Sequence, residues 1–109
     1  MITVTLLKKA DKIVGFISEG HAAYDDSGKD IVCAAVSILV INTVNSIERF
    51  TLDEFEADQD AEDATITFSL KNPDLVSEKA EVLLNALELG IKGISAGNDE
   101  YLQVISKEV

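Results

Sequence analysis

One histidine and one cysteine, each the only residue of its type in the 109-residue chain, lie twelve positions apart as His21 and Cys33. A thiol and an imidazole are the pair that a cysteine hydrolase uses. The imidazole takes the thiol proton, and later returns it to the leaving group. His21 directly follows Gly20, and Cys33 stands where the sequence turns apolar after Asp30. If the chain catalyses a reaction, these two side chains are the candidates.

The residues before Cys33 predict the start of a helix at Ile31, with Asp30 as its N-cap. Cys33 would then be the third helical residue. There the unpaired backbone N–H groups and the positive end of the helix dipole favour a thiolate, and the same N–H groups can bind an oxyanion. Asp30 is also a candidate to orient the imidazole, as are Asp25 and Asp26 in the preceding loop.

Two other interpretations of Cys33 remain open from the residues alone. Free cysteine is among the most frequently buried residue types, so Cys33 could be an inert core residue of a non-catalytic binding module. An exposed, ionised Cys33 could instead serve a thiol redox sensor. A protease needs a reactive Cys33 and an essential His21, a binding module needs neither, and a redox sensor needs Cys33 alone.

The sequence does not predict a metal or a cofactor. One cysteine and one histidine are too few for a structural zinc site. Gly20, Gly28 and Lys29 do not have the spacing of a phosphate-binding loop. We therefore expect no metal ion and no cofactor at this site.

Acidic residues outnumber basic ones by 20 to 9, which gives a formal net charge of −11. The stretch from Asp53 to Asp63 holds seven of the acids and no base. This balance argues against direct binding to nucleic acid and favours a basic protein partner. A lone cysteine fits a reducing compartment. Met1–Thr5 lacks the features of a signal peptide. The apolar run Ile31–Ile41 is too short to span a bilayer. We expect a cytoplasmic protein with no membrane contact.

Hydrophobic periodicity predicts a single α+β domain over residues 1–109, with the order β-β-α-β-β-α-β and one mostly antiparallel sheet covered by two helices. The first helix is apolar nearly all round, which predicts a central, buried element. The second should present Leu75, Val82, Leu83, Ala86, Leu87 and Ile91 to the core. The predicted strands are Ile2–Leu7, Ile13–Ser18, an edge strand in the acidic stretch, Ala64–Leu70 and Tyr101–Ile105; the helices are Ile31–Phe50 and Asp74–Ile94, and a loop covers Ala22–Lys29.

The run Gly20-His21-Ala22, followed by Gly28-Lys29-Asp30-Ile31-Val32-Cys33-Ala34-Ala35-Val36-Ser37, resembles the ribosomal-processing cysteine protease family, Prp. The likeness covers the whole chain in length and element order. It implies a Cys33–His21 dyad in a cysteine endopeptidase that removes the N-terminal extension of large-subunit ribosomal protein twenty-seven. It also implies a homodimer, and a site at which Gly20, Tyr24, Gly28 and Ser37 form the loop or contact the substrate.

Overall fold

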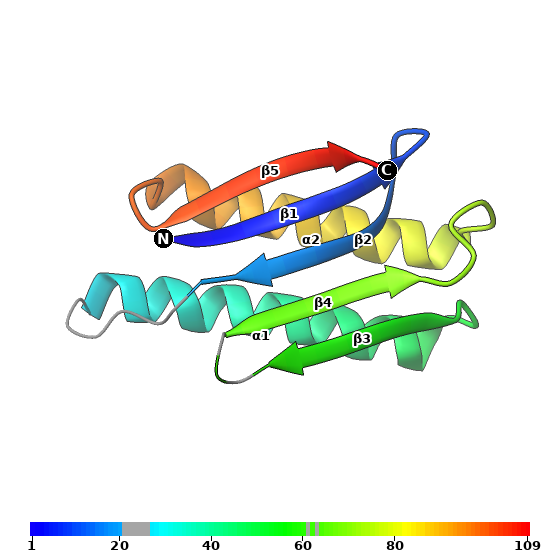
Figure 1. Ribbon diagram of the computed structural model, residues 1–109, viewed down its shortest axis with the longest axis horizontal. Helices are drawn as coiled ribbons and strands as arrows, with labels where there is room; N and C mark the ends of the chain where they lie inside the picture. Colours follow the sequence, from blue (N-terminus) through cyan, green and yellow to red (C-terminus); the bar gives the residue numbers. More distant parts are fainter. Residues whose placement is uncertain (21–26, 61, 63) are drawn as a thin grey trace.

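The computed structural model describes residues 1–20, 27–60, 62 and 64–109, with the backbone alone for residues 27–30. His21, Tyr24, Asp25 and Asp26 therefore lie outside the described residues. The predicted element order is confirmed (Figure 1). The elements are β1 (Ile2–Lys9), β2 (Lys12–Glu19), α1 (Ser27–Phe50), β3 (Phe55–Asp60), β4 (Thr65–Leu70), α2 (Glu78–Gly97) and β5 (Leu102–Glu108).

The five strands form one sheet in the order β3-β4-β2-β1-β5. Three of the four pairings are antiparallel, and only the pairing of β1 with β5 is parallel, so the predicted mostly antiparallel sheet is confirmed. The β1–β2 hairpin turns at Ala10 and Asp11, which both have positive φ (51° and 66°). Two central residues of this kind match the right-handed twist of the flanking strands.

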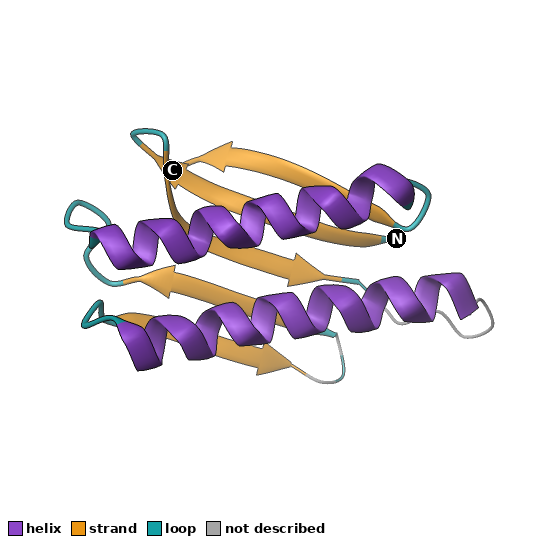
Figure 2. Ribbon diagram, turned by 180° about the vertical axis from the view of Figure 1, so that it is seen from behind, coloured by secondary structure: helices purple, strands orange, loops and turns teal. Residues whose placement is uncertain are grey.

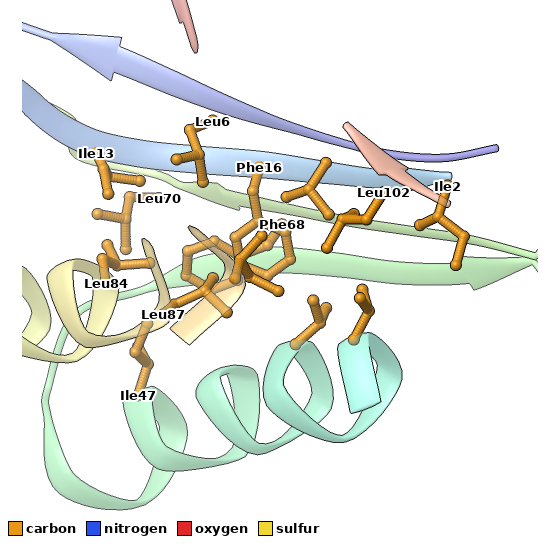
Figure 3. Packing of buried hydrophobic residues seen from close by; sticks show 14 of the residues in the cluster. Ile2, Leu6, Ile13, Phe16, Ile47, Phe68, Leu70, Leu84, Leu87 and Leu102 are labelled. Atoms are coloured by element: carbon orange, nitrogen blue, oxygen red, sulfur yellow. The ribbon is translucent and has the colours of Figure 1, made fainter. Parts of the chain in front are cut away.

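Both helices lie on the same face of the sheet, and none of the described residues forms a helix on the opposite face (Figure 2). The core fills the space between the sheet and these helices (Figure 3). At its centre the rings of Phe16 and Phe68 stack with centroids 5.1 Å apart. Phe55 on β3 adds a tilted ring 5.1 Å from Phe68, which ties the edge strand to the core.

The prediction that α1 is a central, buried helix is wrong. Val32, Val36, Val40 and Ile47 are buried against the sheet, whereas Ile31 is 70% and Ile38 is 68% exposed. The reason is the two-layer architecture, because no further layer covers the outward side of the helices. The segment Ile31–Phe50 has the length and composition of a membrane-crossing helix, whereas the shorter run Ile31–Ile41 does not. In this fold one side of the segment packs on the sheet.

The prediction that Asp30 caps α1 is also wrong. The helix begins at Ser27, so Asp30 lies within it and Cys33 is its seventh residue. Ser27 is itself a residue type that starts helices, and the sequence did not distinguish it from Asp30. Only the first four N–H groups of a helix lack intrahelical partners. The argument that unpaired N–H groups act on Cys33 therefore fails.

The second helix begins at Glu78 and not at Asp74, because Ser77 is its N-cap. The Ser77 hydroxyl accepts a hydrogen bond from the Ala80 N–H at 3.1 Å. Asp53, in the α1–β3 connection, accepts hydrogen bonds from the Ser77 N–H at 2.9 Å and from the Ser77 hydroxyl. This network fixes the start of α2 through a partner 24 residues away.

The buried side of α2 also differs in part from the prediction. Its buried residues are Ala80, Leu84, Leu87 and Ile91, which follow the spacing of one helix face. Leu87 and Ile91 were predicted correctly, and Leu83 is partly buried against the core. Leu75 lies before the helix and is 79% exposed, Val82 is 64% exposed, and Ala86 is also exposed, so these three predictions are wrong.

Candidate active site

Cys33 lines a pocket of about 250 Å³ between α1 and the end of the sheet where β2 ends and β4 begins. The thiol side chain is half-buried and packs against the edge of the core. It is therefore not the fully buried cysteine of the binding-module interpretation. The pocket is lined by Ile2, Ser18, Glu19, Gly20, Cys33, Val36, Ser37, Gln59, Asp60, Ala64, Thr65 and Ile66.

The local packing of α1 directs Cys33 and Ser37 into this pocket. Val36, which is 2% exposed, anchors this part of the helix on the sheet. Cys33 and Ser37 are four residues apart, so their side chains lie on one side of the helix, one turn from each other. The Ser37 hydroxyl is thus available to the same bound molecule as the thiol.

Gly20 closes the pocket where β2 ends, and its conformation requires glycine. Its φ is 136°, which L-residues with side chains rarely adopt. A Cβ at this position would stand 2.7 Å from the Met1 carbonyl oxygen and 2.8 Å from the Ile2 Cα. The chain therefore passes tightly against the start of β1 at the residue immediately before His21.

The charged residues that line the pocket are acidic. Glu19 comes from the end of β2 and Asp60 from the end of β3. Among the described lining residues none is a lysine or arginine. A positive charge that stabilises a thiolate at Cys33 must therefore come from a group other than these residues.

The structure brings together three of the residues predicted for the site, Cys33, Gly20 and Ser37. Gly28 and Asp30 are placed only as backbone in the first turn of α1, while His21 and Tyr24 lie outside the described part of the chain. The predicted oxyanion site at the helix start is not supported, because Cys33 lies more than one turn beyond it.

Sequence reasoning missed the wall of the pocket formed by the β3–β4 hairpin, which contributes Gln59, Asp60, Thr65 and Ile66. The turn between these strands was predicted, but its position beside Cys33 depends on strand order. The antiparallel pairing of β4 with β2, which sets Ile66 opposite Ser18, brings the hairpin to the pocket. A pairing between strands so far apart in the chain leaves no local signal in the sequence.

Comparisons with known proteins identify the family. The family model described as cysteine protease Prp matches residues 1–103. The ribosomal processing cysteine protease Prp of Bacillus subtilis is 28% identical over 109 residues, with 95% of this chain and 96% of that protein covered. Its Staphylococcus aureus counterpart is 27% identical over 105 residues, covering 95% and 97%.

Solved structures show the same fold. The SMU.848 protein of Streptococcus mutans is 27% identical, with a TM-score of 0.87 and coverage of 100% of this chain and 96% of that one. The S. aureus Prp structure with a covalently linked product peptide gives a TM-score of 0.86 at 24% identity, covering 98% and 100%. The chain belongs to the family of ribosomal-processing cysteine proteases, Prp, and is a cysteine protease.

Proposed function

We propose that this chain is a cysteine endopeptidase that uses Cys33 as nucleophile and His21 as general base. The observation that carries the proposal is the pocket, which is lined both by the half-buried Cys33 and by Gly20, the residue bonded to His21. His21 is therefore one residue from the pocket lining in the sequence.

The chemistry proceeds in two steps. His21 takes the proton of the Cys33 thiol, and the thiolate attacks the scissile carbonyl carbon. His21 then gives that proton to the leaving amine as the C–N bond breaks, which leaves a thioester on Cys33. Water, deprotonated by His21, attacks the thioester, and the proton returns to the thiolate as the acid product leaves. The imidazolium formed in the first step supplies the positive charge that the described pocket residues lack.

The neighbouring residues orient these groups and the substrate. Asp30, three residues before Cys33, orients the His21 imidazole by accepting its other N–H. The Ser37 hydroxyl, one turn after Cys33 in the same pocket, donates to the substrate backbone. Gly20, Tyr24 and Gly28 contact the substrate, with Gly28 in the first turn of α1 and not in the loop predicted over Ala22–Lys29.

The substrate is the N-terminal extension of large-subunit ribosomal protein twenty-seven, and cleavage takes place in the cytoplasm. The names of the relatives, which specify ribosomal processing, support this choice. The net charge of −11 supports it independently, because an acidic enzyme attracts a basic ribosomal protein and binds RNA poorly.

The chain acts as a homodimer in which the outward sides of the helices meet. Ile31 and Ile38 on α1, and Val82 and Leu89 on α2, are each seven residues apart and between 64% and 77% exposed. Residues seven apart lie on one side of a helix, so each helix presents an apolar stripe. Two copies related by a two-fold axis cover these stripes mutually.

Sedimentation equilibrium tests this assembly. Ile38→Lys together with Leu89→Lys should give a monomer, because two charges enter the contact. Leu52→Lys, at a loop position that is 99% exposed, is the matched control and should stay dimeric. A wild-type chain that sediments as a monomer at tens of micromolar contradicts the dimer.

The cleavage proposal is tested by incubating the chain with the N-terminally extended ribosomal protein and measuring product mass. The wild type should release one N-terminal fragment, and Cys33→Ser and His21→Ala should release little or none while retaining the wild-type circular dichroism spectrum. Cleavage that survives Cys33→Ser would refute the assigned nucleophile. Binding without cleavage by the wild type would instead favour a non-catalytic binding module of ribosome assembly.

A further inference from the structure

The Cys33 pocket continues into a groove along α1 and the edge strand β3. A second cavity of about 260 Å³ shares Gln59 and Ile66 with the Cys33 pocket. A third, of about 670 Å³, shares Val44 and Ala57 with the second. The three cavities are therefore neighbours and follow one another from the nucleophile to the far end of β3.

One side of α1 forms a wall of this groove. Ser37, Ile41, Val44 and Glu48 follow Cys33 at spacings of three or four residues, so they lie along one side of the helix. From Cys33 to Glu48 the helix rises about 22 Å, at 1.5 Å per residue. An extended peptide advances about 3.3 Å per residue, so about six or seven residues fit beside this wall.

The other wall is the free edge of the sheet. Within the described part of the chain, β3 pairs with β4 alone, so its second edge offers backbone N–H and C=O groups. An extended peptide can add to such an edge as a further strand. Figure 2 shows α1 in front of β4 and β3, so the helix-facing side of a strand added beside β3 would be the side on which α1 lies.

The residues on the two sides of β3 differ in chemistry. Ala57 pairs with the core residue Phe68 and Gln59 with Ile66, so both lie on the side that faces the helices. Glu56 and Asp58 alternate with them along the strand and are both exposed. By this alternation their side chains extend from the open side of the sheet, while Asp58 also borders the second cavity and Glu56 the third. A strand added beside β3 would place alternate side chains against the part of the groove formed by Val44, Ala57 and Ile66 and beside these carboxylates.

Resting on the proposed endopeptidase function, we propose that this groove binds the substrate as an added β-strand. Its occupant is an extended segment adjoining the scissile bond, with apolar side chains at every second position and polar or basic side chains between them. The apolar side chains enter the groove of Val44, Ala57 and Ile66. The basic ones lie beside Glu56 and Asp58.

The binding test uses the Cys33→Ser chain, so that cleavage does not consume the probe. The probe is a fluorescein-labelled, N-acetylated hexapeptide of alternating leucine and lysine, and fluorescence anisotropy gives its Kd. Ala57→Tyr, which fills the groove with a residue that favours strands, should raise the Kd at least about tenfold, a loss of about 1.4 kcal/mol. Ser106→Tyr is the matched control, because Ser106 is small, exposed and on the helix-facing side of the opposite edge strand.

Two further probes separate the backbone and charge contributions. Alternate amides of the hexapeptide can be N-methylated at the odd or at the even positions. Only one of these two peptides should lose binding, because only the amides that face β3 donate to it. Replacing each lysine by glutamine should weaken binding to the wild-type edge, but should change little when Glu56→Gln and Asp58→Asn are present. A control peptide has the same composition, with three leucines followed by three lysines. If it binds as tightly as the alternating peptide, the proposal that apolar and basic side chains alternate in the bound strand is wrong.

The same variants distinguish this inference from the cleavage proposal. If Ala57→Tyr and Ser106→Tyr bind the probe equally, the groove assignment is wrong, even where the wild type cleaves the extended ribosomal protein. If the wild type binds the probe in the groove but cleaves no extended protein, the proposed activity is wrong and the groove assignment stands. With both correct, Ala57→Tyr should lower kcat/KM for the extended protein mainly by raising KM.

Discussion

Replacing Ser77 by alanine removes two interactions that fix the start of α2. The hydroxyl caps the helix by accepting from the Ala80 N–H, and the loss of such a cap costs about 1 kcal/mol. It also donates to the Asp53 carboxylate, and a hydrogen bond to a charged group contributes about 1.5–3 kcal/mol before the discount for partial exposure. We therefore expect Ser77→Ala to lower the free energy of unfolding by about 2–3 kcal/mol, or Tm by about 10 °C.

The loss should depend on pH because one partner is a carboxylate. Partial burial has the largest single effect on the pKa of Asp53, and this effect raises the pKa. The hydrogen bonds from Ser77 and Thr51 together outweigh burial, so the pKa of Asp53 lies below the usual 3.8. A lowered pKa stabilises the fold above the unfolded value, and this contribution disappears as pH falls through the folded value. The effect of Ser77→Ala should be full at pH 7 and smaller below pH 3.8.

Urea unfolding followed by circular dichroism measures these differences. Ser77→Thr keeps a hydroxyl and should lose less than half as much stability as Ser77→Ala. Ser69→Ala, at an exposed serine on β4, should change stability little. The reasoning is refuted if Ser77→Ala costs no more than Ser69→Ala, or if its cost is equal at pH 7 and at the lowest pH where the wild type stays folded.

Three other outcomes are expected. His21→Ala should lower turnover by roughly 10²–10⁴-fold with unchanged circular dichroism, and an unchanged rate would remove His21 from the mechanism. Burial has the largest single effect on the pKa of Glu88, and this effect raises the pKa. The Lys8 and Lys92 ammonium groups, whose Nζ atoms lie 3.1 Å and 3.2 Å from the Glu88 Oε2, together outweigh burial and lower the pKa. Glu88→Gln should therefore cost about 1 kcal/mol in urea unfolding at pH 7 and less below pH 4.5, whereas a pH-independent cost would contradict this. Added salt should lower kcat/KM for the whole basic substrate more than for a short neutral peptide. If kcat/KM falls equally with salt for both substrates, the acidic residues between 53 and 63 do not attract the substrate.

The sequence predicted the element order because each element has a local signature. The β1–β2 hairpin and β4 alternate, and both helices have long apolar periodic segments. The buried side of α1 was not predictable in the same way. Its sequence is apolar on nearly every side, so the choice of Val36 over Ile38 as a core residue depends on which face of the sheet the helices cover.

Helix starts were the least predictable feature. Asp74 and Ser77 are both favourable N-caps, and Ser77 prevails because Asp53 binds it from another part of the chain. The site was predictable as far as its chemistry is local. Cys33, Ser37 and Gly20 could be selected from the sequence, but the wall that Gln59 and Asp60 add depends on how β4 pairs with β2.

The parallel pairing of β1 with β5 has a consequence for how the chain is made. Ile2 pairs with Leu102 and Lys8 with Glu108, so the first strand acquires its second neighbour only from residues about a hundred positions later. Contacts over such a separation slow folding, and on the ribosome this one cannot form until β5 has emerged. Until then β1, with its apolar Ile2, Val4 and Leu6, has an unpaired edge that other chains can join. The newly made chain is therefore expected to be most prone to aggregation just before its synthesis reaches β5.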